Sequence, residues 1–109
     1  MSLGSEWDDV RSLLFQLRRV SESQFEKHGG RWSINEQINH THSEVSELYE
    51  SLRSTRLGDH SHEHVLEEIC DIMYSALTNA HILNYSDEEI LEGLIKTLRK
   101  IQKRVGQIA

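Results

Sequence analysis

The chain has 109 residues, which suits a single domain over residues 1–109, and its only cysteine, Cys70, excludes an internal disulfide. It contains no proline and 28% of its residues are charged. Good helix formers dominate its periodic segments, so we expect an all-α domain. No apolar run approaches the roughly 18 residues that a membrane span needs. Residues 1–5 lack the features of a secretory signal and are typical of a cloning remnant, and we expect a cytoplasmic location.

The formal net charge of −6 is unevenly distributed. Residues 94–109 carry five basic side chains and no acidic one, which leaves seven basic and 18 acidic side chains, a net charge of −11, for residues 1–93. Binding to a phosphate backbone needs a broad basic face. The distribution therefore argues against nucleic acid as a main partner.

Apolar spacing and capping signals predict four helices, at about residues 6–27, 33–57, 62–84 and from 86 onward. Two of these helices open with a capping box, Ser33-x-x-Glu36 and Ser86-x-x-Glu89. The connections are short, and short connections between long amphipathic helices favour antiparallel neighbours. The expected architecture is an antiparallel four-helix bundle-like domain.

Each predicted helix carries an apolar stripe that we expect to be buried. On the second helix the stripe is Ile38, Thr41, Val45, Leu48 and Leu52. On the third it is Val65, Ile69, Ile72, Met73, Ala76, Ala80 and Leu83, and on the fourth Ile90, Leu94, Leu98, Ile101 and Val105. Cys70 is expected to be a small buried side chain. Because so small a domain would still leave apolar surface exposed, we expect a homodimer.

Two acidic pairs stand beside these stripes on consecutive antiparallel helices, namely Glu44-x-x-Glu47 and Glu68-x-x-Asp71. Acidic pairs at this spacing are commonly solvated charge, and what distinguishes these two is their place at the edge of the buried face. Counted from a turn near Asp59, Glu47 and Asp71 should lie at the same height. Four carboxylates drawn to one cleft repel one another, and hard divalent cations such as Mg²⁺ or Mn²⁺ would neutralise them.

The sequence segments that contain the two acidic pairs also resemble those of a known family. Glu44-Val45-Ser46-Glu47-Leu48 and Leu66-Glu67-Glu68-Ile69-Cys70-Asp71-Ile72-Met73-Tyr74 closely resemble the E-x-x-E and E-E-x-x-D signatures of MazG-like nucleoside triphosphate pyrophosphohydrolases. The resemblance covers roughly residues 24–104, and the twenty residues between Glu47 and Glu68 suit the family's spacing.

This resemblance implies an all-α fold, a dimer or dimer of dimers, and hydrolysis of a nucleoside triphosphate to the monophosphate and pyrophosphate. Carried over, Glu44, Glu47, Glu68 and Asp71 would be the magnesium ligands. Cys70 stands where the family commonly has glycine. Where the family often has an asparagine near the end of the third helix, Asn79 or His81 would have to serve.

Four further side chains are candidates for contact with the substrate. Trp32 stacks on a nucleobase, or it covers the bundle end or fills a dimer interface. His40 shares the face of the first acidic pair, where it supports the metal ligands or is a simple surface histidine. Lys96 and Arg99 neutralise a triphosphate, or they form a favourable solvated helix C-terminus.

The cluster His60-x-His62-x-His64 allows two interpretations. Imidazoles bind transition metals, which would suggest a zinc or nickel site. Alternation in a turn gives poor tetrahedral geometry without a fourth ligand, so a solvated loop is the default.

The acidic residues and the family resemblance together predict a magnesium-dependent nucleoside triphosphate pyrophosphohydrolase, with Glu47 as the base that takes a proton from the attacking water. Such an activity commonly removes unwanted nucleotides. Two alternatives stay open: phosphoribosyl-ATP pyrophosphatase, which shares the superfamily's helical site, and a non-catalytic helical dimerisation or regulatory module.

Overall fold

The structure, a computed structural model, describes residues 4–56 and 62–106. These ranges are helical and contain no strand, which confirms the expected all-α class with four helices. A short 3₁₀ helix, η1 (Ser5–Trp7), precedes α1 (Asp8–Lys27), α2 (Ile34–Arg56), α3 (His62–Ile82) and α4 (Asp87–Arg104). The turn expected near Asp59 lies outside the described residues. None of the described helices has the length and apolar character that crossing a membrane requires.

Local sequence signals set where the helices begin and end. The Ser33 amide donates to Glu36 Oε1 at 3.0 Å, and the Glu36 amide donates to Ser33 Oγ at 3.2 Å. The same reciprocal pair joins Ser86 and Glu89 at 2.9 and 3.1 Å. Both predicted capping boxes are therefore confirmed. Before α2, Gly30 adopts a φ of 124°, a conformation that side chains disfavour, and the chain turns there out of α1.

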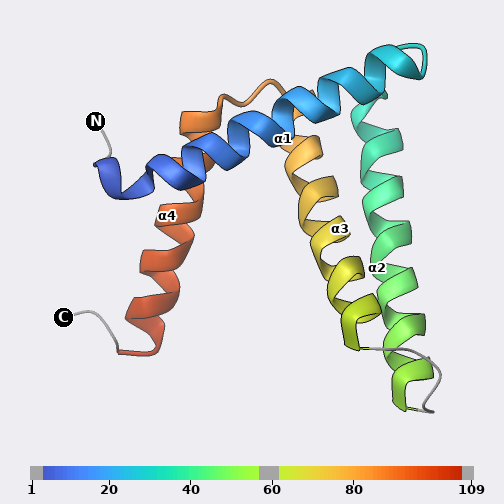
Figure 1. The fold of residues 1–109 in the computed structure, drawn as a ribbon. Coiled ribbons are helices and arrows are strands. Elements are labelled where there is room, and N and C mark those ends of the chain that lie inside the picture. Colours follow the sequence, from blue (N-terminus) through green and yellow to red (C-terminus); the bar gives the residue numbers. More distant parts are fainter. Residues whose placement is uncertain (1–3, 57–61, 107–109) are drawn as a thin grey trace.

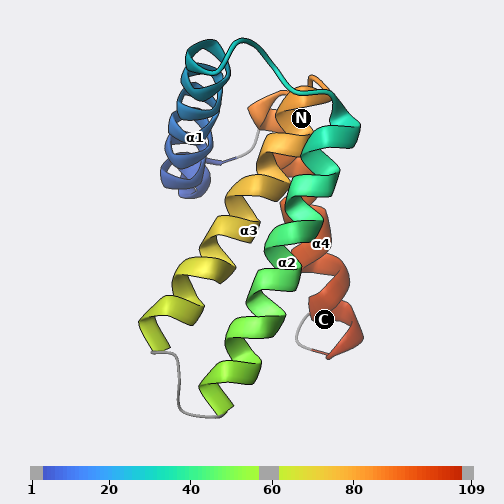
Figure 2. The ribbon, with the colours of Figure 1, turned by 90° about the vertical axis from the view of Figure 1, so that its right-hand side faces the viewer.

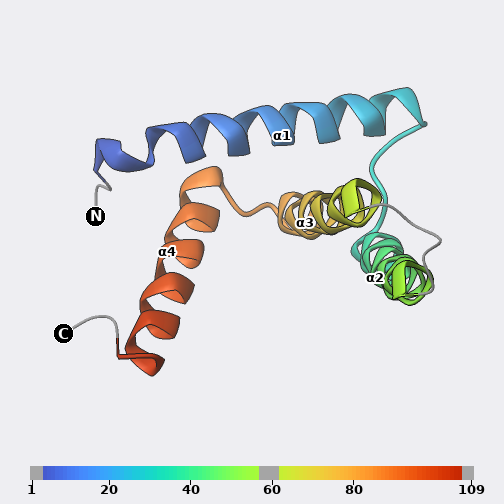
Figure 3. The same cartoon turned by 60° about the horizontal axis from the view of Figure 1, so that its bottom comes forward.

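The helices form an open arrangement built on one tight pair. Helices α2 and α3 pack side by side as an antiparallel hairpin, and α1 runs across the end of this hairpin (Figures 1 and 2). Helix α4 packs on α1 and stands apart from the hairpin (Figure 3). Leu14 on α1 and Leu91 on α4 are the two fully buried apolar side chains of the described ranges. A single chain therefore leaves the bundle open beside α4.

The contact between α2 and α3 is polar. The Gln37 amide nitrogen donates to Ser75 Oγ at 2.9 Å, and the hydroxyls of Thr41 and Ser75 are 2.7 Å apart. Further along, the Ser51 hydroxyl donates to Glu68 Oε1. Gln37, Ser51 and Ser75 are each 5% exposed or less. We call this row of hydrogen-bonded residues the polar seam.

The polar seam displaces the apolar stripe that we predicted as core on α2. The seam positions come one residue before Ile38 and Leu52, so these side chains point about 100° away from the interface. Ile38, Val45 and Leu52 are 50%, 47% and 43% exposed. The prediction that they are buried within one chain is wrong, because hydrogen-bonding side chains occupy the helix contact instead.

The exposed apolar residues of α2 and α3 lie on one side of the hairpin. In an antiparallel pair of right-handed helices, the residue after each interface position projects to the same side, since reversing a helix also reverses its apparent rotation. This apolar face consists of Ile38, Val45, Tyr49 and Leu52 from α2, Leu66, Ile69 and Met73 from α3, and Leu83 directly after α3, all between 41% and 62% exposed.

Three further burial predictions are wrong for the single chain. Ile69, Met73 and Leu83 of the predicted third stripe are 41%, 62% and 52% exposed, because they belong to the apolar face. The α4 stripe from Leu94 to Val105 is exposed, because α4 contacts α1 rather than the hairpin. Cys70 is exposed as well, since it comes directly after Ile69 of the apolar face and does not face α2.

One buried side chain of α3 lacks partners. His81 is 3% exposed, and neither of its ring nitrogens forms a hydrogen bond within the described residues. Burial lowers the pKa of His81, and the nearby Arg18 lowers it further, while Asp87 and Glu22 act in the opposite direction. The folded chain therefore holds this imidazole neutral.

We predict that His81 makes the fold sensitive to acid. Because its pKa is lowered in the folded chain, the unfolded chain binds the additional proton, and stability falls as the pH drops below about 6.5. His81→Gln, whose amide does not titrate in this range, should lose less stability than the parent between pH 8 and pH 5 in urea denaturation. His42→Gln, at an exposed position on α2, should keep the parent's dependence. Equal pH dependence in all three proteins would contradict this account.

Candidate functional site

The polar seam sets the height of the acidic residues along the hairpin. Ser51 lies opposite Glu68 and Thr41 lies opposite Ser75. These two contacts bracket Glu47 and Asp71, which therefore lie at the same level on the two antiparallel helices. Each directly precedes a half-buried apolar residue that continues the row of seam positions, Leu48 on α2 and Ile72 on α3, so both project from the side of the hairpin opposite the apolar face.

Glu68 belongs to the polar seam, Glu44 lies half-buried on α2, and each is paired with a histidine one turn earlier. His40 Nε2 is 3.0 Å from Glu44 Oε1, and His64 Nε2 is 2.8 Å from Glu68 Oε1. The glutamate side chains are only 15% and 13% exposed. The motif His-x-x-x-Glu-x-x-Glu/Asp thus occurs once on each of the two helices. The sequence analysis did not predict the pairing of His64 with Glu68. The i,i+4 spacing is the signal that would have revealed it.

Glu68 has one buried oxygen without a hydrogen bond. Its Oε1 accepts from Ser51 and contacts His64, whereas Oε2 is buried and has no partner in the described part of the chain. Leaving a buried carboxylate oxygen unpaired is costly, so this atom suits a cation or a water molecule.

Glu47 and Asp71 differ from the buried glutamates in being exposed. Neither carboxylate forms an ion pair or hydrogen bond with the described residues. They line, together with Glu68, a groove of about 530 Å³ that also includes His64 and Ser51. We call it the acidic groove.

A second concavity adjoins the acidic groove. It measures about 320 Å³ and lies between α1, the start of α2, and α3. Its aromatic walls are Phe25, Trp32 and Tyr74, and Glu44 and Asp71 line it as well. Along the hairpin, Glu47 and Asp71 lie further from α1 than Trp32 does. We call this space the aromatic cavity, and Asp71 is common to it and the acidic groove.

The predicted magnesium ligands are distributed over both spaces. Within residues 4–56 and 62–106, no three side chains of His, Cys, Asp or Glu gather closely enough to hold a metal ion by themselves. Mg²⁺ commonly binds through one or two carboxylates together with substrate phosphates, rather than in a cage made by the protein alone. The oxygen-only set of carboxylates and the unpaired Glu68 Oε2 fit that mode of binding.

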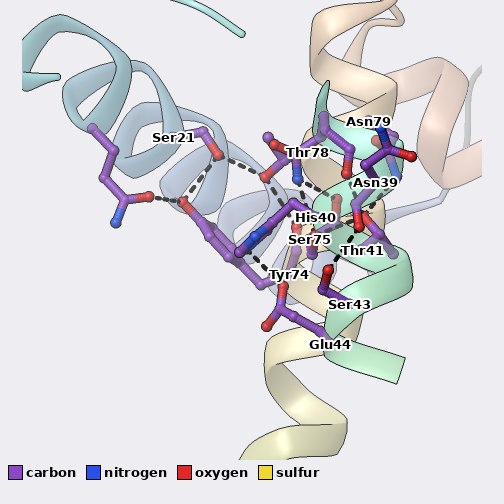
Figure 4. A network of polar contacts seen from close by, with 12 residues as sticks. Ser21, Asn39, His40, Thr41, Ser43, Glu44, Tyr74, Ser75, Thr78 and Asn79 are labelled. Atoms are coloured by element: carbon purple, nitrogen blue, oxygen red, sulfur yellow. Dashed lines mark hydrogen bonds and ion pairs between the residues drawn. The ribbon is translucent and has the colours of Figure 1, made fainter. Parts of the chain in front are cut away.

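Of the four substrate candidates, the structure brings two to the site. Trp32 lines the aromatic cavity, and its ring meets the His40 ring edge-on with the centroids 5.4 Å apart. His40 therefore contacts Trp32 as well as Glu44. Figure 4 shows the pair of His40 and Glu44. Lys96 and Arg99 lie on α4 and line neither space, because α4 stands apart from the hairpin.

The remaining sequence candidates take other places. His60 lies outside the described residues, as does the side chain of His62, so their predicted cluster has no described geometry. Asn79 belongs to the polar seam, where its amide nitrogen donates to Thr41 Oγ1 at 3.1 Å (Figure 4). Its Oδ1 is buried without a partner in the described ranges. His81 lines neither the acidic groove nor the aromatic cavity.

Comparisons with protein families, curated proteins and solved structures find no match for this chain. The geometry of its own residues therefore carries the interpretation of the site.

We predict that Ser51 supports the acidic groove. Ser51→Ala removes a buried donor to Glu68 and should lower the free energy of unfolding by about 1–3 kcal/mol, measured by urea denaturation. Ser46→Ala, at an exposed position on the same helix, should change it by less than about 0.5 kcal/mol. Similar values for the two variants would show that the Ser51 contact contributes little.

Proposed function

We propose that the chain is a magnesium-dependent nucleoside triphosphate pyrophosphohydrolase of the MazG-like kind. The observation that carries the proposal is the unpaired, buried Oε2 of Glu68 beside the exposed carboxylates of Glu47 and Asp71. A buried, unpaired carboxylate oxygen beside two other negative side chains is unfavourable, and a divalent cation with its phosphate ligands would relieve that cost.

The surroundings of each acidic residue suggest its role in holding the metal ion or accepting a proton. Glu44, Glu68 and Asp71 would hold Mg²⁺ together with Glu47, and His40 and His64 orient the two buried glutamates. The bound ion would neutralise phosphate charge and lower the pKa of a water molecule. Mn²⁺ offers the same charge to the same oxygen ligands.

Glu47 is the best candidate for the general base. Its carboxylate is exposed and has no partner in the described ranges, whereas Glu44 and Glu68 each contact a histidine. A carboxylate that is not held by neighbours can accept a proton from a water molecule in the acidic groove. Asp71 borders both spaces and is better placed to hold the ion between base and phosphate.

The adjoining cavity suits the rest of a nucleotide. At about 320 Å³ it lies at the small end of the range for ligand pockets, and its aromatic walls suit a nucleobase. Phosphates extending from it would reach the carboxylates. Attack between the α- and β-phosphates would release a monophosphate and pyrophosphate, which suits removal of unwanted nucleotides in the cytoplasm.

Two alternatives have different consequences. Phosphoribosyl-ATP is a larger substrate of the same chemical type, and it belongs in any substrate panel. A non-catalytic dimerisation or regulatory module is favoured by one observation, the lack of a three-residue metal group in the described chain. Absence of magnesium-dependent pyrophosphate release from every nucleotide in the panel would support that module.

The apolar face supports the expected homodimer, or a dimer of dimers. It exposes eight large apolar side chains on one side of the hairpin, and burying them against a second copy would be favourable. Because the acidic groove lies on the opposite side, such an association would leave it open.

We predict that amide substitutions in the acidic groove abolish turnover. Glu47→Gln and Asp71→Asn should each lower magnesium-dependent pyrophosphate release on the order of 10²–10⁴-fold, because a base or an ion ligand is lost. Circular dichroism should show an unchanged helical fold. The matched control is Glu92→Gln on α4, an exposed position outside the groove, which should keep the parent activity. Full activity in the Glu47 and Asp71 variants would refute the assigned roles.

We predict that a charge on the apolar face prevents self-association. Met73, which is 62% exposed, lies within the face, and Met73→Lys should sediment as a monomer at micromolar concentration where the parent sediments as a dimer. Phe15→Lys places the same charge on an exposed apolar position of α1 and should leave the dimer intact. A monomeric parent protein would reject the proposed assembly.

A further inference from the structure

The wall of the aromatic cavity contains a row of hydroxyl groups that runs between α1 and α3. Ser21 Oγ is 3.0 Å from Thr78 Oγ1 and donates to Tyr74 Oη at 3.1 Å (Figure 4). Tyr74 Oη in turn donates to Gln24 Oε1 at 2.6 Å. Ser21 and Thr78 are 2% and 5% exposed, so water does not compete for the inner end of this row.

The row has one direction. Each hydroxyl owns a single hydrogen, and Ser21 gives its hydrogen to Tyr74, which gives its own to Gln24. The inner end is consistent with this direction, because Thr78 donates to the Tyr74 carbonyl or to Ser21. The last acceptor is therefore the carbonyl oxygen of the Gln24 amide.

The Gln24 amide turns its Oε1 towards Tyr74, from which it accepts a hydrogen bond. With Oε1 taken by Tyr74, the two hydrogens on Nε2 are left, and this nitrogen has no partner in the described residues. Gln24 lines the cavity at an exposed position, where a ligand can reach it. The other glutamine of the cavity, Gln37, is not available, because its amide nitrogen donates to Ser75.

We propose that Gln24 is a specificity-determining residue that selects a nucleobase with an exocyclic carbonyl over one with an amino group. The inference rests on the proposed nucleotide function. An amide held as a donor pairs with a carbonyl oxygen, such as that of uracil or hypoxanthine. It meets the amino group of cytosine or adenine donor to donor, which leaves both groups unpaired.

Nucleoside binding without divalent ions tests the proposal apart from catalysis. The chain has two tryptophans, so Trp7→Phe leaves Trp32, which lines the cavity, as the sole tryptophan of the chain. Quenching of its fluorescence would be measured in titrations with uridine and cytidine, and with inosine and adenosine. The first member of each pair has a carbonyl beside a protonated ring nitrogen, and the second has an amino group beside an unprotonated one. We expect the carbonyl member of at least one pair to bind about three- to tenfold more tightly.

Two variants then assign the preference to the oriented amide. Tyr74→Phe frees the amide to rotate, and the affinity ratio should fall towards one. Gln24→Glu keeps an oxygen for the contact with Tyr74 but replaces the donor with an acceptor at an exposed position, and the preference should reverse towards the amino member. Tyr85→Phe, an exposed tyrosine outside the cavity, should keep the parent ratio.

The outcomes separate this proposal from the proposed function. Equal binding within both pairs, a ratio unchanged in Gln24→Glu, or no binding of any nucleoside would overturn the role of Gln24, even if nucleotides are hydrolysed. A carbonyl preference that reverses in Gln24→Glu would support the role, even if magnesium-dependent hydrolysis is absent and the enzyme assignment fails.

Discussion

The polar seam between α2 and α3 is the interaction on which the rest of the molecule depends. Its hydroxyl and amide groups are buried, and most of them form hydrogen bonds with the facing helix. A buried polar group without a partner lowers the free energy of unfolding, which is small in a domain of this size. The contacts of Gln37 and Thr41 with Ser75, and of Ser51 with Glu68, are satisfied together in one register. A shift of the helices would break all of them.

The seam also sorts the remaining side chains into two sides. Residues that follow seam positions form the apolar face, and residues that precede them form the side that holds Glu47 and Asp71. Helix α1 crosses the latter side and closes the aromatic cavity through the contacts of Ser21. The surface proposed for assembly and the residues proposed for chemistry therefore lie on opposite sides of one hairpin, so a second copy could cover the first without blocking the second.

The features that depend on neighbouring residues were predictable from the sequence. The helix limits and the capping boxes at Ser33 and Ser86 follow from local rules, and counting along the chain placed Glu47 and Asp71 at one height. The rotation of each helix about its own axis, which decides which side chains face the neighbouring helix, was not predictable. Hydrophobic spacing identified Ile38 and its stripe as apolar, but it does not say whether the same chain or a second one covers that stripe.

Contacts across the fold explain the other omissions. The role of His64 in holding Glu68 was obscured by its membership in a histidine-rich stretch, and the Tyr74–Gln24 contact joins residues fifty positions apart. No local pattern encodes such a contact, because it exists only once α1 is laid across the hairpin.

The central claim is that Glu68 and its neighbours receive a divalent cation together with the phosphates of a nucleotide. Crystals grown with Mn²⁺ and a nucleoside triphosphate analogue that resists cleavage between the α- and β-phosphates would test it through the anomalous scattering of manganese. The account predicts an anomalous peak in contact with Glu68 Oε2 and the Asp71 carboxylate, with phosphate oxygens completing the coordination. Bound nucleotide without manganese at these carboxylates, or manganese bound only elsewhere, would contradict it.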